Sequence, residues 1–299
     1  MYVKNMDKKP TALICGCAKN CGQYIDGVFK NIKQLQEIFD IPMIYISYDK
    51  SSDDTLNKLT QKQSDYNLTI LEGDKPLLNC VTDGILRVVN ICNARNRYME
   101  KIINMETTAE YFIVMDMDDV CSDEINIQPI RNVMSDASEW DGVTFDNIRY
   151  YDFWALSIRP FTVSCFMSAD VIKTMRLMLL NLRNKRDNPG KYIDCESAFN
   201  GFGIYKSSFY RNYYNPFHSK GLHITADLLE CMKSYNIKYP SFLQNKLLDC
   251  EHRAFHINAK KLTGARLKIS KEQIFKDYDG EHARWLYNSN SSLRDPLSS

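Results

Sequence analysis

The stretch from Tyr111 to Asp119 constrains the fold of this chain more than any other. Its first five residues, Tyr-Phe-Ile-Val-Met, are apolar or aromatic, which is typical of a short buried strand in a parallel sheet. Three carboxylates follow at once, on Asp116, Asp118 and Asp119. In an extended chain Asp116 and Asp118 lie on the same side. Two carboxylates this close repel each other unless a cation lies between them, so the stretch predicts a buried strand that ends in a metal site.

Oxygen ligands of this kind favour Mg²⁺ or Mn²⁺, and open α/β sheets bind their ligands at the carboxyl ends of their strands. An isolated Asp-x-Asp also occurs in solvated turns and at helix N-caps. The weight of this prediction therefore depends on the strands and helices around it.

Short apolar runs alternate with segments of helical spacing along the first part of the chain. Strands are expected over 11–17, 43–48 and 68–71, and helices over 24–39, 56–64 and 82–103. This alternation predicts an α/β fold with a mostly parallel central sheet flanked by helices. The later part predicts strands at 141–145 and 161–167, a helix over 169–182 and a charged loop over 184–190.

Composition narrows the class of protein. A net charge of +1 gives no reason to expect binding to nucleic acid or to a membrane surface. No apolar run reaches the ~18 residues of a membrane span, and the first residues lack a signal-peptide core. Of the ten cysteines only Cys15, Cys17 and Cys21 cluster, without the paired spacing of a zinc site. We therefore expect free thiols and a cytoplasmic protein, in the host cytoplasm if the chain is viral.

Further motifs follow one another in a fixed order along the chain. They are Asp49-Lys-Ser-Ser-Asp-Asp-Thr55, Asn93-Ala-Arg-Asn-Arg97, Asp116-Met-Asp-Asp119, Tyr151-Asp-Phe-Trp-Ala-Leu156, Asn200-Gly-Phe-Gly-Ile-Tyr205 and Cys250-Glu-His252. In this order the chain resembles the nucleotide-sugar-dependent glycosyltransferases of the GT-A fold. Within that group it resembles the capsule-type mannosyltransferase-like and large-virus enzymes.

The resemblance implies a donor site and a metal site. A nucleoside-diphosphate sugar, with UDP favoured and GDP-mannose as the alternative, would contact six residues. These are Ala18, Asp49, Arg95, Asp116, Met117 and Arg266. Mn²⁺ or Mg²⁺ would be held by Asp116, Asp118 and His252, with His256 as the second choice of histidine. The acceptor would be a glycan or a glycoprotein.

A transferase that inverts the sugar also needs a general base on the acceptor hydroxyl, for which the candidates are Glu251, Glu196 and Asp194. The sequence leaves open whether the reaction inverts or retains, and which oligomeric state the protein has. We expect one domain over 1–285, with a nucleotide-sugar-binding half at 11–120. The acceptor-binding half at 121–285 would carry a smaller mixed sheet, and 286–299 would form a mobile tail.

Other readings of the same residues remain open. A nucleotidyltransferase that makes an activated sugar would share the sheet and the acidic metal site. A non-catalytic carbohydrate-binding module could use the acidic trio for Ca²⁺. Asp194 and Glu196 could also be drawn as the carboxylate pair of a glycoside hydrolase, and the cysteine cluster as a thiolate metal site.

Overall fold

The fold is described from a computed structural model. The residues it describes are 8–73, 84–104, 109–147, 149–162, 164–165, 170–215, 230, 233–234 and 249–275. The expected tail at 286–299, Cys80 and Cys231 lie outside these ranges, as does part of the strand expected over 161–167.

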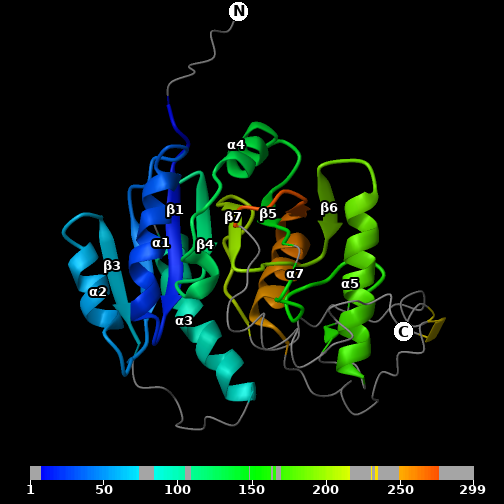
Figure 1. The fold of residues 1–299 in the computed structure, drawn as a ribbon, viewed down its shortest axis with the longest axis horizontal. Coiled ribbons are helices and arrows are strands. Elements are labelled where there is room, and N and C mark those ends of the chain that lie inside the picture. The colour runs from blue at the N-terminus through cyan, green and yellow to red at the C-terminus, as the bar shows by residue number, and fades with distance from the viewer. Residues whose placement is uncertain are drawn as a thin grey trace, which may run out of the picture.

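One sheet of eight strands, in the order β3-β2-β1-β4-β7-β5-β8-β6, runs through the molecule (Figure 1). The strands are β1 (Ala12–Ala18), β2 (Ile44–Tyr48), β3 (Leu68–Glu72), β4 (Tyr111–Met115), β5 (Gly142–Phe145), β6 (Tyr192–Cys195), β7 (Phe202–Lys206) and β8 (Leu267–Ser270). The first four pair in parallel, as do β5 and β8. β7 and β6 run antiparallel to their neighbours. The prediction of an α/β fold with a mostly parallel central sheet is confirmed.

The later strands extend this same sheet rather than forming a separate smaller one. β4 pairs with β1 on one side and with the antiparallel β7 on the other, where Met115 lies opposite Phe202. The edge of a buried strand carries backbone N–H and C=O groups that need partners. β7 supplies those partners, so the mixed region expected on the acceptor side is continuous with the parallel region.

Helices cover both faces of the sheet. The described helices are α1 (Gly22–Leu35), α2 (Thr55–Lys62), α3 (Gly84–Asn104), α4 (Gln128–Ser135), α5 (Val171–Asp187) and α7 (Glu251–Thr263), with a 3₁₀ turn η1 at Asp119–Cys121. Phe112 and Val114 of β4 pack with apolar side chains of α3, α5 and α7. Ile113 and Met115 pack on the opposite face with those of α1, α2 and α4. β4 is therefore buried on both faces, which explains its unbroken apolar run.

Two local predictions for the later part of the chain were wrong. In the described portion of 161–167 the structure has no strand, and Phe161 forms only an isolated bridge with Ile158. The loop expected from 184 is helical as far as Asp187. Lys185 and Arg186 lie in the last turn of α5, where positive charge is favourable to the helix dipole. Helices α4 and α7 and strands β6, β7 and β8 were not anticipated.

Within the described ranges, no helix combines the length and the apolarity that crossing a membrane requires.

Candidate active site

A cavity of about 490 Å³ lies at the carboxyl ends of β1 and β4. The chain leaves β1 through α1, which covers one face of the sheet, and reaches β4 through α3, which covers the other. Neighbouring strands whose connections run on opposite faces leave a crevice at their carboxyl ends, where ligands of open α/β sheets bind. The acidic trio, which the sequence placed at the end of a buried strand, thus lines a cavity.

Acidic side chains dominate one side of this cavity. Its walls contain the carboxylates of Asp116, Asp118, Asp119, Asp152 and Glu251, and the basic side chains of Arg87, Arg95 and His252. Arg95 and His252 are buried, whereas Arg87 is exposed. The described part of the cavity therefore carries more negative than positive charge.

Arg95 of α3 is the positive centre of this cluster. Its Nε donates to Glu251 Oε1 at 3.3 Å, and its Nη2 lies 3.8 Å from Asp116 Oδ1. The guanidinium also lies over the rings of Phe199 and Tyr214, at 5.2 and 5.5 Å from their centroids. A guanidinium held by two carboxylates and two aromatic faces has a fixed position, so Arg95 joins the acidic trio to the start of α7.

Two carboxylates of the acidic trio accept hydrogen bonds from neighbouring groups. Tyr151 donates its hydroxyl hydrogen to Asp116 Oδ2 at 3.2 Å, and the Val120 N–H donates to Asp118 Oδ1 at 3.3 Å. Burial, followed by the charge of Asp118, raises the pKa of Asp116 well above its ordinary value. Burial and then the charge of Asp119 raise the pKa of Asp118 to about 6. A divalent cation is the kind of ligand that would relieve this repulsion.

The two histidines of α7 differ in what they contact. His256 is hydrogen-bonded through Nδ1 to Ser197 at 2.9 Å and through Nε2 to Tyr205 at 3.0 Å. His252 stacks on Phe199 at 3.8 Å between centroids, and neither ring nitrogen has a hydrogen-bond partner in the described structure. Burial and then the charge of Arg95 lower the pKa of His252 well below its ordinary value. His256 is therefore a satisfied core residue, while His252 is a neutral imidazole that lines the cavity with its nitrogens unused.

No three His, Cys, Asp or Glu side chains of the described residues are grouped closely enough to hold a metal ion by themselves. The three clustered cysteines, Cys15, Cys17 and Cys21, are free thiols and form no such group either. Burial is the largest influence on the thiol of Cys17 and raises its pKa to about 12. A thiol that stays protonated is a poor metal ligand.

Asp152 is a cavity carboxylate that sequence reasoning did not select. It lies in the loop after β5, and the Ala155 N–H donates to its Oδ1 at 3.3 Å. Burial and then the charge of Glu251 raise its pKa to about 6. The available signal was its position inside Tyr150-Tyr-Asp-Phe-Trp, because burial of the aromatic side chains around it brings this carboxylate close to the protein interior.

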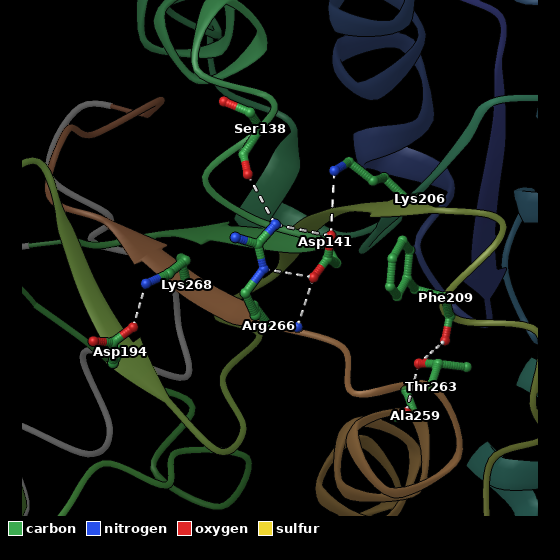
Figure 2. A network of polar contacts seen from close by, with 9 residues as sticks. All are labelled: Ser138, Asp141, Asp194, Lys206, Phe209, Ala259, Thr263, Arg266 and Lys268. Atoms are coloured by element: carbon green, nitrogen blue, oxygen red, sulfur yellow. Dashed lines mark hydrogen bonds and ion pairs between the residues drawn. The ribbon is translucent and has the colours of Figure 1, made fainter.

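Three of the predicted site residues lie elsewhere. Asp194, Glu196 and Arg266 line a second cavity of about 480 Å³, between β6, β8 and the end of α7. Asp194 forms an ion pair with Lys268 (Figure 2), and Glu196 pairs with Lys260 at 2.6 Å. The structure does not bring them to the cavity that holds the acidic trio.

Arg266 forms a structural fork on a buried carboxylate (Figure 2). Its Nε and Nη2 donate to Asp141 at 2.9 and 3.2 Å, and Lys206 donates to the same carboxylate at 3.2 Å. Burial alone raises the pKa of Asp141, but the hydrogen bonds from Arg266 and Lys206 outweigh it and hold the pKa below its ordinary value. The interaction therefore stabilises the fold above the ordinary carboxyl pKa and is lost as pH falls below it.

The remaining predicted donor residues lie at or just after the carboxyl ends of β1, β2 and β4, but they do not line the first cavity. Asp49, just after β2, receives a 2.6 Å hydrogen bond from Arg97 Nη2. Ala18 is buried at the end of β1, and its carbonyl accepts from the Asp49 N–H at 3.1 Å. Met117 is also buried, and a Cβ on Gly16 would lie 2.6 Å from its sulfur. β1 therefore needs glycine at this position for the loop after β4 to lie against it.

Replacing Arg266 with alanine should lower the free energy of unfolding by about 1–3 kcal/mol, because Asp141 keeps Lys206 but loses its bidentate partner. The loss should be visible in urea titrations at pH 7 and should shrink at pH 3. Ligand-induced stabilisation at the first cavity should be unchanged. If the variant loses that ligand response while its fold stays intact, Arg266 belongs to the donor site after all.

Comparison with known proteins gives only distant likenesses. No family model and no curated protein matches the chain. The chain is similar to S. aureus TarS in complex with UDP-GlcNAc, at 13% identity and a TM-score of 0.40 over 91% of this chain and 60% of that chain. It is also similar to the mannosyltransferase PcManGT from Pyrobaculum calidifontis in complex with GDP-Man and Mn²⁺. The sequence identity is 13% and the TM-score 0.37, over 70% of this chain and 48% of that chain. It is similar as well to glucosyl-3-phosphoglycerate synthase from M. tuberculosis, at 11% identity and a TM-score of 0.43 over 97% of this chain and 82% of that chain.

The chain thus spans less than two thirds of the length of the TarS chain. At identities this low and TM-scores below 0.5, these likenesses leave the function to be argued from the cavity and its residues.

Proposed function

We propose that the protein is a metal-dependent glycosyltransferase. It would move a sugar from a nucleoside-diphosphate sugar, with UDP favoured and GDP-mannose as the alternative, to a hydroxyl group of a glycan or other acceptor. Residues 11–120 would form the donor half and 121–285 the acceptor half. The observation that supports this most is the cluster of five carboxylates around buried Arg95, at the crevice where β1 and β4 end.

The residues present fit a Mn²⁺ or Mg²⁺ ion. Asp118 and Asp116 offer hard oxygen ligands, and His252 offers a buried nitrogen without a hydrogen-bond partner among the described residues. Ions of this kind are usually held by one or two carboxylates together with phosphate oxygens of the substrate. A protein cage of three ligands is therefore not needed before the donor binds. When bound, the ion offsets the negative charge that develops on the departing diphosphate.

The side chains would divide the work of transfer. The bond between the anomeric carbon and the diphosphate oxygen breaks, and its electron pair leaves with the nucleoside diphosphate. A new bond forms from the acceptor oxygen, whose proton passes to a carboxylate if the reaction inverts the sugar. Among the described residues, Asp152 and Glu251 are the cavity carboxylates outside the acidic trio. Because Glu251 is tied to Arg95, we assign the general base to Asp152.

The nucleoside would extend toward the ends of β2 and β3. There Arg97 links Asp49 to Ser47, donating to Ser47 Oγ at 2.7 Å. A Cβ on Gly73 would lie 2.4 Å from Arg97 Nη1, so glycine allows this close packing at the end of β3. We propose that Asp49 accepts hydrogen bonds from the ribose or the base.

Thermal unfolding with and without ligands tests the proposal. UDP, GDP, UTP, GTP, UDP-sugars and GDP-mannose would each be added with Mn²⁺, with EDTA and with Ca²⁺. A ligand that binds only the native state stabilises it by ~2.7 kcal/mol at a hundredfold excess over its Kd. We expect one nucleoside diphosphate to raise the midpoint of thermal unfolding strongly with Mn²⁺ and weakly with EDTA.

The same experiment separates the alternatives. A shift with nucleoside triphosphates but not diphosphates would favour the nucleotidyltransferase. A shift with Ca²⁺ that no nucleotide increases would favour the binding module. If no nucleotide changes the midpoint under any condition, the donor site proposed here does not exist.

The rate of transfer should rise with pH through about 6 at saturating Mn²⁺, because the base assigned to Asp152 must be ionised and its pKa is raised to about 6. Glu251 raises this pKa and Arg95 lowers it. Asp152→Asn should lower the rate about a hundredfold or more and flatten the profile, while the Mn²⁺-dependent midpoint shift with nucleotide remains. A profile unchanged in the variant would remove Asp152 from the role of base.

A further inference from the structure

The cavity that holds the acidic cluster has a second wall that is apolar. This wall comes from α3, from the loop that carries Asp152, and from the start of α5. Its main side chains are Val88, Ile91, Phe153, Trp154, Ile172 and Met175. These side chains carry no charge to pair with a diphosphate or a metal ion, and among the six Trp154 alone has a hydrogen-bond donor.

This wall is rigid at the back and open at the front. Val88, Phe153 and Met175 are 0%, 1% and 4% exposed and belong to the core cluster on this face of the sheet. Ile172 is 37% exposed, one of the few large apolar side chains of the described residues that is so open. A buried support beneath an exposed isoleucine holds the surface in place without any ligand, so its shape is preformed.

The loop Asp152-Phe153-Trp154 connects the two walls. Its carboxylate belongs to the acidic side, and the next two residues belong to the apolar side. A molecule whose hydroxyl group reaches Asp152 can place its adjoining part against Trp154, two residues further along the same loop, and toward the other side chains of the apolar wall. A sugar alone would cover only part of this surface, through its C–H faces against Trp154, whereas an alkyl or aryl group would bury more of its apolar area.

We propose that the acceptor carries an apolar group next to its reacting hydroxyl, such as the alkyl or aryl aglycone of a glycoside. The inference rests on the proposed function, because it identifies the acceptor side of the same site. The donor is assigned to the acidic wall and the ends of β2 and β3, where the charged and polar partners of a nucleotide lie. The acceptor would therefore contact the apolar wall. This wall favours an acceptor with a hydrophobic group over one with a charged group.

Binding of a graded series of alkyl glycosides tests this without requiring turnover. Methyl, hexyl and octyl glucosides, each below its micelle-forming concentration, would be titrated against the full chain in the presence of Mn²⁺ and a nucleoside diphosphate. Saturation-transfer NMR would report both affinity and which ligand protons contact the protein. We expect affinity to rise about tenfold or more from methyl to octyl, since burial of roughly two methylene groups suffices for that factor, with the strongest transfer to the alkyl chain.

Two matched variants locate the effect. Ile172→Asp should abolish the gain with chain length, because it places a charge in the apolar wall. Leu262→Asp makes the same kind of change at a side chain that is 72% exposed on α7 and does not line the cavity, so the gain should remain.

Affinity that does not change with chain length, or a gain that Ile172→Asp leaves intact, would overturn the inference. The proposed function is judged separately by the nucleotide-induced shift in unfolding temperature. If that shift is present while the alkyl series is flat, the transferase proposal survives and the apolar acceptor does not. If the shift is absent, both fall together.

Discussion

Asp118→Asn should abolish the Mn²⁺-dependent stabilisation by nucleotide and lower the rate of sugar transfer about a thousandfold or more, because Lewis-acid stabilisation of the leaving diphosphate contributes several kcal/mol. The change is isosteric, and the asparagine oxygen can still accept from the Val120 N–H that Asp118 binds now. Nucleoside diphosphate release and thermal unfolding, both with and without Mn²⁺, measure the two losses.

The fold of this variant should not suffer. Burial and the charge of Asp119 raise the pKa of Asp118 to about 6, so at neutral pH the folded state holds a carboxylate charge that it disfavours. Removing that charge should leave the midpoint of the metal-free protein unchanged or higher, as expected where a site is kept for function at the expense of stability.

Asp123→Asn serves as the matched control for Asp118→Asn. It makes the same substitution at an exposed position five residues further on, outside the cavity walls. Its metal dependence and its rate should equal those of the wild type. Retention of the Mn²⁺-dependent nucleotide shift in Asp118→Asn would contradict the assigned metal site.

Arg253→Met should lower the free energy of unfolding by about 3–5 kcal/mol, because it leaves a buried carboxylate without its partner. Arg253 and Asp249 side chains are 0% and 1% exposed, and Nε of Arg253 donates to Asp249 Oδ1 at 2.9 Å. Arg253 also contacts Ser157. This buried pair fixes the start of α7, the helix that brings Glu251 and His252 to the cavity. Urea titration should show a lower midpoint with little change in slope.

Two further variants separate an unpaired charge from a simple loss of packing. Arg253→Met combined with Asp249→Asn should recover most of the loss, since a buried pair replaced as a unit costs far less than one broken partner. Lys268→Met removes the cation from the ion pair with Asp194, whose side chain is 87% exposed, and should cost about 1 kcal/mol or less. If Arg253→Met is equally mild, the pair does not hold α7.

The strand that ends in the acidic trio could be predicted because its residues meet most of their requirements locally. Five apolar residues before three carboxylates predict a buried strand whose end is charged, and β4 is buried on both faces with Asp116 and Asp118 at the cavity. The alternation of strands and helices in the first half was predictable for the same reason. Hydrophobic spacing of 2 and 3.6 is a property of neighbouring residues.

The placement of Asp194 and Glu196 could not be predicted in this way. They were expected near the acceptor hydroxyl as candidates for the general base of an inverting transferase. Strand β6 lies at the far edge of the sheet, with β7, β5 and β8 between it and β4. The order of strands in a sheet depends on pairing between distant segments, which no local pattern records.

The sequence by itself determined the α/β class, the buried strand β4 and the acidic residues at its end, since these follow from spacing and side-chain polarity. Only the tertiary structure decided which distant residues join them. It placed Asp152, which the sequence did not single out, in the cavity that Arg95, Glu251 and His252 also line, tied Arg266 to Asp141 instead, and left His256 bonded in the core. Burial and the approach of charges from other elements set the pKa values of the cavity carboxylates and leave the ring nitrogens of His252 without partners among the described residues, and the proposed function rests on both. These are properties of the folded chain as a whole.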